Sequence, residues 1–180
     1  MMHYLALLRG INVGGNKKIK MAELKQLLET NGLGRVQTYI QSGNVLFESE
    51  EDPLALQTKI ETEIKNAFGF SVAVILRTAD ELKRVIADCP YSPDSLAEGD
   101  SIHVTFLGEE PSEKDLEKLS AGANEFDEYQ ILGREIHIWY RQRILDSKLT
   151  NQLQKLKVPA SSRNWNTVTK LAEMMQAMEV

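Results

Sequence analysis

Three short polar segments carry the residue types that could bind or transform a ligand. The first, residues 9–18, reads Arg-Gly-Ile-Asn-Val-Gly-Gly-Asn-Lys-Lys between a predicted strand and a predicted helix. Such a loop can bring backbone N–H groups to an anion, while the helix dipole and the lysines add positive charge. It is not a Walker A loop and lacks the Gly-x-Gly-x-x-Gly spacing. The alternative is a long glycine-rich connection that needs unusual backbone dihedrals. Its candidate ligand-binding residues are Arg9, Asn12, Gly14, Gly15, Asn16 and Lys17.

The second segment, residues 41–44, reads Gln-Ser-Gly-Asn between two β-rich runs. A tight hairpin turn explains most of it, because Gly43 can take a positive φ. The side-chain amides of Gln41 and Asn44 exceed what a turn needs. We therefore expect Gln41, Ser42 and Asn44 to belong to a ligand site.

The third segment, residues 163–166, reads Arg-Asn-Trp-Asn and is predicted to open the last helix, with Asn166 or Thr167 as N-cap. Capping does not explain a guanidinium that could hold phosphate or carboxylate, or an indole that could stack on a base or sugar. The alternative is a tryptophan in the core and an arginine in a salt bridge. The candidate residues here are Arg163, Asn164, Trp165 and Asn166.

The first half of the chain is predicted to hold these segments on an α+β framework. Apolar residues at helical spacing, a glycine turn between two β-rich runs, and short buried-type strands give the order βαββαβ. This is the ferredoxin-like split motif, in which two helices cover one face of an antiparallel sheet. The expected strands are residues 3–8, 36–40, 45–47 and 72–76, and the expected helices are residues 21–31 and 54–68.

The same pattern recurs in the second half, which indicates a structural duplication without obvious sequence identity. We expect an N-terminal half at residues 1–78, a connecting helix and loop at 79–100, and a C-terminal half at 101–180. Strands that are apolar at both parities, such as residues 4–8, predict sheets covered on both faces. In the second half the expected strands are 102–107, 129–132, 135–140 and 160–163, and the expected helices are 112–120, 148–157 and 168–178.

Composition narrows the class of protein. The chain has 180 residues and a net charge of −5, which argues against bulk binding of nucleic acid or anionic membranes. Residues 1–47 and 134–170 are basic, whereas residues 48–133 are acidic. If the basic ends meet, a local positive surface would suit a small anionic ligand; the alternative is that the charges only coat solvent faces.

A single cysteine, Cys89, and an opening apolar run too short for a membrane span predict a protein of the cytoplasm. The three histidines are scattered, so we expect structural histidines with satisfied hydrogen bonds and no metal site. No catalytic residue and no cofactor can be named, and the oligomeric state is open.

Several motifs together resemble the bacterial domain-of-unknown-function 1697 family. They are Arg-Gly-Ile-Asn-Val-Gly-Gly at 9–15, Tyr-Ile-Gln-Ser-Gly-Asn-Val at 39–45 and Arg-Asn-Trp-Asn-Thr-Val at 163–168. Shorter matches between them extend the resemblance over the full length. It implies a fold of two ferredoxin-like halves and no established activity.

The leading hypothesis is a protein that binds a small anionic or nucleotide-like ligand in a cleft formed by residues 9–18, 41–44 and 163–166. One alternative is an enzyme of phosphoryl or nucleotidyl transfer, which predicts a carboxylate pair beside the basic loop. Another is an RNA-binding module, disfavoured because the RNP pattern is missing and the net charge is negative. The last is a protein-interaction module whose motifs hold the halves together.

Overall fold

The chain forms two compact units, each built on a four-stranded antiparallel sheet. The computed structural model describes residues 1–179. The first unit comprises Met1–Arg84 and the chain from Leu171 onward, and the second comprises Val85–Lys170. The boundaries expected at residues 78 and 101 were drawn from the repeated order of strands and helices and not from compactness, and they stay a prediction.

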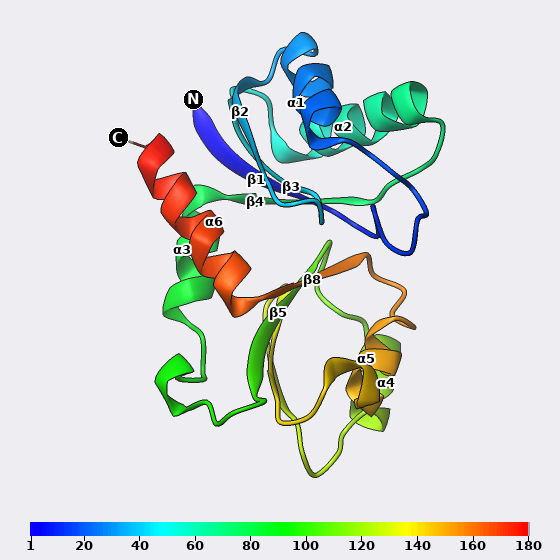
Figure 1. Cartoon of the computed structure of the whole chain (residues 1–180), viewed down its shortest axis with the longest axis vertical. Helices are drawn as coiled ribbons and strands as arrows, with labels where there is room; N and C mark the ends of the chain where they lie inside the picture. Colours follow the sequence, from blue (N-terminus) through cyan, green and yellow to red (C-terminus); the bar gives the residue numbers. More distant parts are fainter. Residues whose placement is uncertain (180) are drawn as a thin grey trace. The chain divides into compact units, whose positions relative to one another are not determined.

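The first unit has the predicted βαββαβ order, with the strands in the spatial order β2-β3-β1-β4. Helices α1 and α2 cover one face of this sheet (Figure 1). Helix α3 follows the last strand directly. The elements are β1 (Met2–Leu8), α1 (Met21–Thr30), β2 (Gly34–Tyr39), β3 (Asn44–Ser49), α2 (Pro53–Phe68), β4 (Val74–Thr78) and α3 (Ala79–Ala87).

Local sequence signals explain where these helices begin and end. Asp52 caps α2 by accepting a hydrogen bond from the Ala55 N–H at 2.9 Å, and Gly69 ends the helix with a φ of +84°. Thr78 and Glu81 form a capping box at the start of α3, because each side chain accepts a hydrogen bond from the other residue's N–H.

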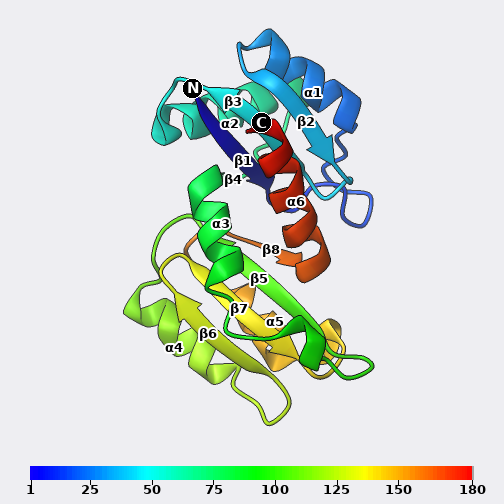
Figure 2. The same ribbon diagram turned by 90° about the vertical axis from the view of Figure 1, so that its left-hand side faces the viewer.

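The second unit repeats this order, with the strands arranged β6-β7-β5-β8. Strands β6, β7 and β5 lie side by side in Figure 2, with α4 and α5 on one face of the sheet. The elements are two 3-10 turns, η1 (Pro93–Ser95) and η2 (Ile144–Asp146), with β5 (Ser101–Leu107), α4 (Glu113–Ala121), β6 (Glu128–Leu132), β7 (Glu135–Tyr140), α5 (Lys148–Leu153), β8 (Ala160–Asn164) and α6 (Trp165–Met178).

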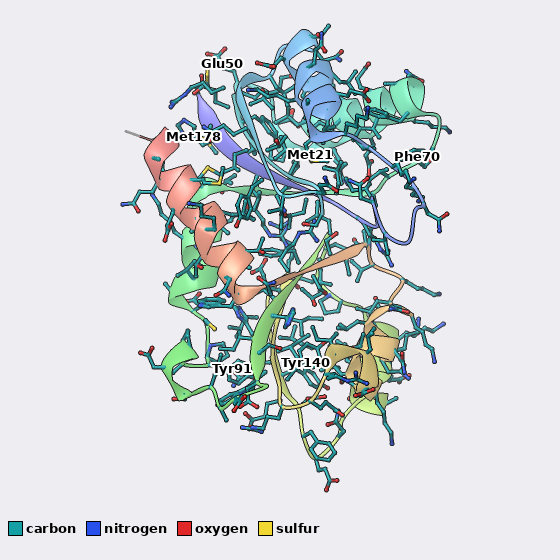
Figure 3. The ribbon with its side chains drawn as sticks, in the orientation of Figure 1. Met21, Glu50, Phe70, Tyr91, Tyr140 and Met178 are labelled. Atoms are coloured by element: carbon teal, nitrogen blue, oxygen red, sulfur yellow. The ribbon has the colours of Figure 1, made fainter. Side chains whose placement is uncertain are left out.

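In each unit an apolar core lies between the sheet and the helices that cover it. In the first unit, Tyr4 and Phe47 stack in this core with ring centroids 5.5 Å apart. Residues of the opposite parity, such as Leu5 and Leu46, are also fully buried. The apolar runs at both parities therefore correspond to buried side chains on both faces, as predicted. Figure 3 shows the side chains, with Met21 labelled at the start of α1 and Tyr140 on the second sheet.

The architecture is an α+β fold of two similar halves, each a ferredoxin-like arrangement, as the sequence pattern predicts. Two helix bounds, the end of α5 and the start of α6, differ from the predicted ones by three residues or more. Helix α5 stops at Leu153 rather than near residue 157, because the Asp115 carboxylate accepts a hydrogen bond from the Lys157 N–H at 3.0 Å and holds that segment outside the helix.

Helix α6 begins at Trp165, three residues earlier than predicted. The side chain of Asn164 accepts a hydrogen bond from the Thr167 N–H at 2.8 Å, so Asn164 is the N-cap. The predicted caps, Asn166 and Thr167, are wrong because both lie inside the first turn of the helix.

The expectation of satisfied histidines is wrong for His137. Its side chain is buried on β7, and Nδ1 has no hydrogen-bond partner within residues 1–179. Burial lowers its pKa below the ordinary value of 6.5, so the ring stays neutral at neutral pH. His3 does have a polar neighbour, since its Nε2 lies 3.4 Å from Glu48 Oε2.

Candidate functional site

The glycine-rich loop, residues 9–18, is a folded structure with its own internal bonds. Ile11 and Ile19 are buried and fix both ends of the loop in the core of the first unit. At its tip, the Asn16 N–H donates to the Val13 carbonyl at 3.0 Å, and Gly14 and Gly15 have φ of +58° and +80°. Glycine is favoured at both positions because it adopts a positive φ without the strain that a side chain brings.

Asn12 is the central hydrogen-bonding residue of this loop. Its Oδ1 accepts from the Ile19 N–H at 2.9 Å, and its Nδ2 donates to the Ile19 carbonyl at 3.0 Å and to the Gln41 carbonyl at 2.7 Å. Its φ of +57° is one that asparagine tolerates better than most residues. Asn12 therefore joins the glycine-rich loop to the hairpin turn, residues 41–44.

A second contact joins β1 to the hairpin turn. The Leu8 N–H donates to the Gly43 carbonyl at 2.9 Å, and a Cβ built on Gly43 would lie 2.8 Å from the Leu8 Cβ. Gly43 also has a φ of +91°. The turn therefore favours glycine for two reasons, the lack of space for a Cβ and the positive φ. Two of the three predicted segments thus meet in the first unit.

The meeting point contains a hollow of about 380 Å³, which we call the loop hollow. Pockets of roughly 300 Å³ or more are large enough for a whole small ligand. The hollow lies at the N-terminus of α1, where no side chain caps the helix. It is lined by Asn12, Gly15, Lys18, Ile19, Lys20, Glu23 and Gln41.

The residues of the loop hollow divide into those that hold the loop and those that are available. The side-chain amide of Asn12 is already bonded to backbone groups of Ile19 and Gln41. By contrast, the side chains of Lys18, Lys20 and Gln41 make no hydrogen bond or ion pair with other residues in the described part of the chain. The available groups are thus two ammonium groups and one amide, a set that suits an anion.

Several predicted site residues have structural roles instead. Lys17 Nζ donates to the Ser71 carbonyl at 3.0 Å, outside the lining of the hollow. Asn44 is buried in β3, and its amide donates to the Tyr39 carbonyl and to the Ser42 hydroxyl. Arg9, Gly14 and Asn16 are exposed but do not line the hollow.

Lys20 and Glu23 line the hollow, but sequence reasoning did not include them among the site residues. The sequence feature that could have identified them is their place at the start of the predicted helix, since Lys20 is the N-cap and Glu23 lies in the first turn of α1. Lys18 stood in the predicted loop without being named as a ligand-binding residue. Of the residues that were named, Asn12, Gly15 and Gln41 line the hollow.

The third segment, residues 163–166, lies in the second unit and closely matches a feature of the first. Arg163 is the fourth residue of β8, and Arg77 is the fourth residue of β4. Each guanidinium donates from Nη1 to the carbonyl of the preceding residue at 2.9 Å, and both are buried. Burial lowers the pKa of Arg163 to about 10.

The match extends to the next residue. Thr78 follows Arg77 and caps α3, while Asn164 follows Arg163 and caps α6. Each half thus ends its sheet with a buried arginine and then a capping residue. Because Arg77 and Thr78 belong to none of the three predicted segments, this repeat favours a structural role for Arg163 and Asn164. Trp165 is half-buried and Asn166 is exposed.

A comparison of the two halves also shows that the glycine-rich loop belongs to an unusually long connection. In the second unit, β5 is joined to α4 by residues 108–112 only, and Ser112 caps the helix with its side chain. In the first unit the equivalent connection runs from residue 9 to residue 20 and leaves α1 without a side-chain cap. The fold does not need the longer connection, so its length and composition call for another explanation.

A family model described as "Protein of unknown function (DUF1697)" matches residues 1–137. The chain belongs to the DUF1697 family. This DUF1697 chain is also similar to a solved structure, "conserved bacterial protein SP0830 from Streptococcus pneumoniae". The two share 25% sequence identity with a TM-score of 0.76, over 97% of this chain and 98% of that chain. A search of curated proteins finds no match.

The matched region of this DUF1697 chain contains the whole first unit except its C-terminal segment, and therefore contains the loop hollow. Within residues 1–179, no helix is long and apolar enough to cross a membrane. The same residues contain no group of three or more His, Cys, Asp or Glu side chains that could hold a metal ion.

Proposed function

We propose that this DUF1697 protein binds a small anionic or nucleotide-like ligand in the loop hollow of its first unit. The observation that carries this proposal is the side-chain inventory of the hollow. Lys18, Lys20 and Gln41 face a space of about 380 Å³ with no partner among residues 1–179. Lys18 and Lys20 lie on a connection that is longer than the equivalent connection of the second half, and Gln41 lies in the hairpin turn.

Electrostatics supports an anion over a neutral ligand. Two lysines and one glutamate line the hollow, which gives a net charge of +1 on its wall. The first backbone N–H groups of α1 have no side-chain acceptor and add the positive end of a helix dipole. An anion held there would gain charge-assisted hydrogen bonds, which are about twice as strong as neutral ones.

The test is a binding titration with adenosine 5′-monophosphate and inorganic phosphate, using the double variant Lys18→Ala/Lys20→Ala. The matched control is Lys25→Ala, because Lys25 is exposed on α1 and does not line the hollow. The double variant should bind at least ~10-fold more weakly, which corresponds to about 1.4 kcal/mol, and the control should bind like wild type. Equal affinities in all three proteins would refute the proposal.

Membership of residues 163–166 in the ligand site stays a prediction, and the structural match with Arg77 counts against it. Phosphoryl or nucleotidyl transfer also stays a prediction; Glu23 is the carboxylate that lines the hollow, whereas that chemistry called for a pair. Base stacking on Tyr4 and Phe47 is disfavoured, because both rings are buried under the helices of the first unit. A cytoplasmic location stays a prediction.

A further inference from the structure

Glu23 is the residue of the loop hollow that a simple anion would not use. It lies in the first turn of α1, its side chain is exposed, and it lines the hollow together with Lys18 and Lys20. Its carboxylate forms no ion pair and accepts no hydrogen bond from the described residues, although Lys20 is three positions away on the same stretch of chain. The two opposite charges therefore both remain available.

A carboxylate accepts hydrogen bonds and donates none. A bare phosphate offers mainly acceptors at neutral pH, so Glu23 would repel it while the lysines attract it. A ligand that also carries hydroxyl groups would give Glu23 donors and turn that repulsion into charge-assisted hydrogen bonds. The amide of Gln41 can serve either part, because it holds both a donor and an acceptor.

The size and the net charge of the hollow limit the ligand further. A volume of about 380 Å³ exceeds the needs of a lone phosphate and is in the range of whole small molecules. An ammonium could also pair with Glu23, but a zwitterion has little net charge to match a wall of net charge +1. A hydroxyl-bearing phosphate keeps its negative charge and satisfies Glu23 as well.

We infer that the ligand of the loop hollow is a phosphorylated sugar, free or as the ribose phosphate of a nucleotide, with its hydroxyl groups donating to Glu23. This inference rests on the proposed function. In this arrangement Lys18 and Lys20 hold the phosphate, and Glu23 selects for the sugar. Glu23 would thus set specificity, while the lysines would set affinity for the phosphate group.

The experiment is calorimetric titration of the full chain with four probes: inorganic phosphate, n-pentyl phosphate, ribose 5-phosphate and phosphoethanolamine. Pentyl phosphate keeps the phosphate and the chain length but has no hydroxyl group. Wild type is compared with Glu23→Gln and with Glu29→Gln, since Glu29 is exposed on α1 and does not line the hollow. Thermal unfolding checks that all three proteins are folded.

Wild type and Glu29→Gln should bind ribose 5-phosphate at least ~10-fold more tightly than pentyl phosphate. In Glu23→Gln that ratio should fall below ~3, and pentyl phosphate should bind no more weakly than to wild type, because the repulsion is removed. Loss of the ratio together with retained pentyl phosphate binding would support the inference.

Other outcomes overturn it. If pentyl phosphate or phosphoethanolamine binds as tightly as ribose 5-phosphate, or if the ratio survives in Glu23→Gln, the sugar-specific role of Glu23 is wrong while anion binding stands. If none of the four probes binds, both the inference and the proposed function fail for this class of ligand.

Discussion

The side-chain amide of Asn12 donates a 2.7 Å hydrogen bond to the backbone carbonyl of Gln41, and so links two segments that are 29 residues apart in the chain. The same side chain makes two further bonds to the backbone of Ile19. The shape of the loop hollow therefore depends on a residue whose own polar groups are already engaged. Its contribution to a ligand site is positional.

The first prediction concerns Asn12→Ala. The change removes three hydrogen bonds and leaves the Ile19 and Gln41 backbone groups without this partner, in a loop where residue 12 has a φ of +57°. We expect a loss of about 2 kcal/mol in the free energy of unfolding, measured by urea denaturation. Asn16→Ala is the control, since its exposed side chain makes no such bonds, and an equal loss there would contradict the prediction.

The second prediction compares two glycines with positive φ. In Gly43→Ala the new Cβ would lie 2.8 Å from Leu8 Cβ and 2.9 Å from Ile11 Cδ1, in addition to the backbone strain. In Gly14→Ala nothing lies within 4 Å, so only strain remains. We expect Gly14→Ala to lower the free energy of unfolding by about 1 kcal/mol and Gly43→Ala by at least ~2 kcal/mol more. Similar values for both would show that the contact to Leu8 relaxes easily.

The third prediction treats Arg77 and Arg163 as equivalent. Arg77→Met and Arg163→Met each remove a buried guanidinium that donates to a neighbouring carbonyl. Both variants should have a lower thermal unfolding temperature than wild type, because each loses on the order of 2 kcal/mol in the free energy of unfolding. Both should bind adenosine 5′-monophosphate like wild type while folded. Weaker binding in Arg163→Met alone would return that residue to the ligand site.

The fourth prediction concerns stability in mild acid. Burial lowers the pKa of His103 from 6.5 to about 4, so between these pH values the unfolded chain takes up a proton that the folded chain does not. The free energy of unfolding should therefore fall as the pH drops from about 6.5 toward 4. Urea denaturation at several pH values should show a shallower fall in His103→Gln.

That variant should retain part of the slope, because burial also lowers the pKa of His137. Hydrogen bonds lower the pKa of Asp115 and Asp127 despite their burial, so the stability that these carboxylates contribute is lost only at still lower pH, below their ordinary value of 3.8. An unchanged slope in His103→Gln would show that His103 does not contribute to it.

Most of the fold could be predicted because its signals are local. The helical spacing of apolar residues, the short buried-type runs and the glycine turn between two β-rich runs identify the strands and helices in order. Bounds were missed where a distant group decides them, as when Asp115 binds the backbone at Lys157 and shortens α5. The early start of α6 was missed because Asn164 serves both as the end of a strand and as a helix cap.

The candidate site was less predictable from the sequence. Polar residues such as Asn12, Lys17 and Asn44 can either bind a ligand or hold the backbone, and only hydrogen-bond geometry separates the two roles. A motif-based reading also separated Arg163 from Arg77, because the strands around them share little sequence. Their common geometry becomes visible only when the two sheets are compared strand by strand.

The unequal connections in the two halves determine how many ligand sites each chain should have. A duplicated fold could in principle carry two copies of one site. The extended connection that forms the loop hollow belongs to the first half, however, whereas in the second half residues 108–112 alone join β5 to α4. A saturating titration of the proposed ligand should therefore reach a stoichiometry of one molecule per chain, with a single class of affinity.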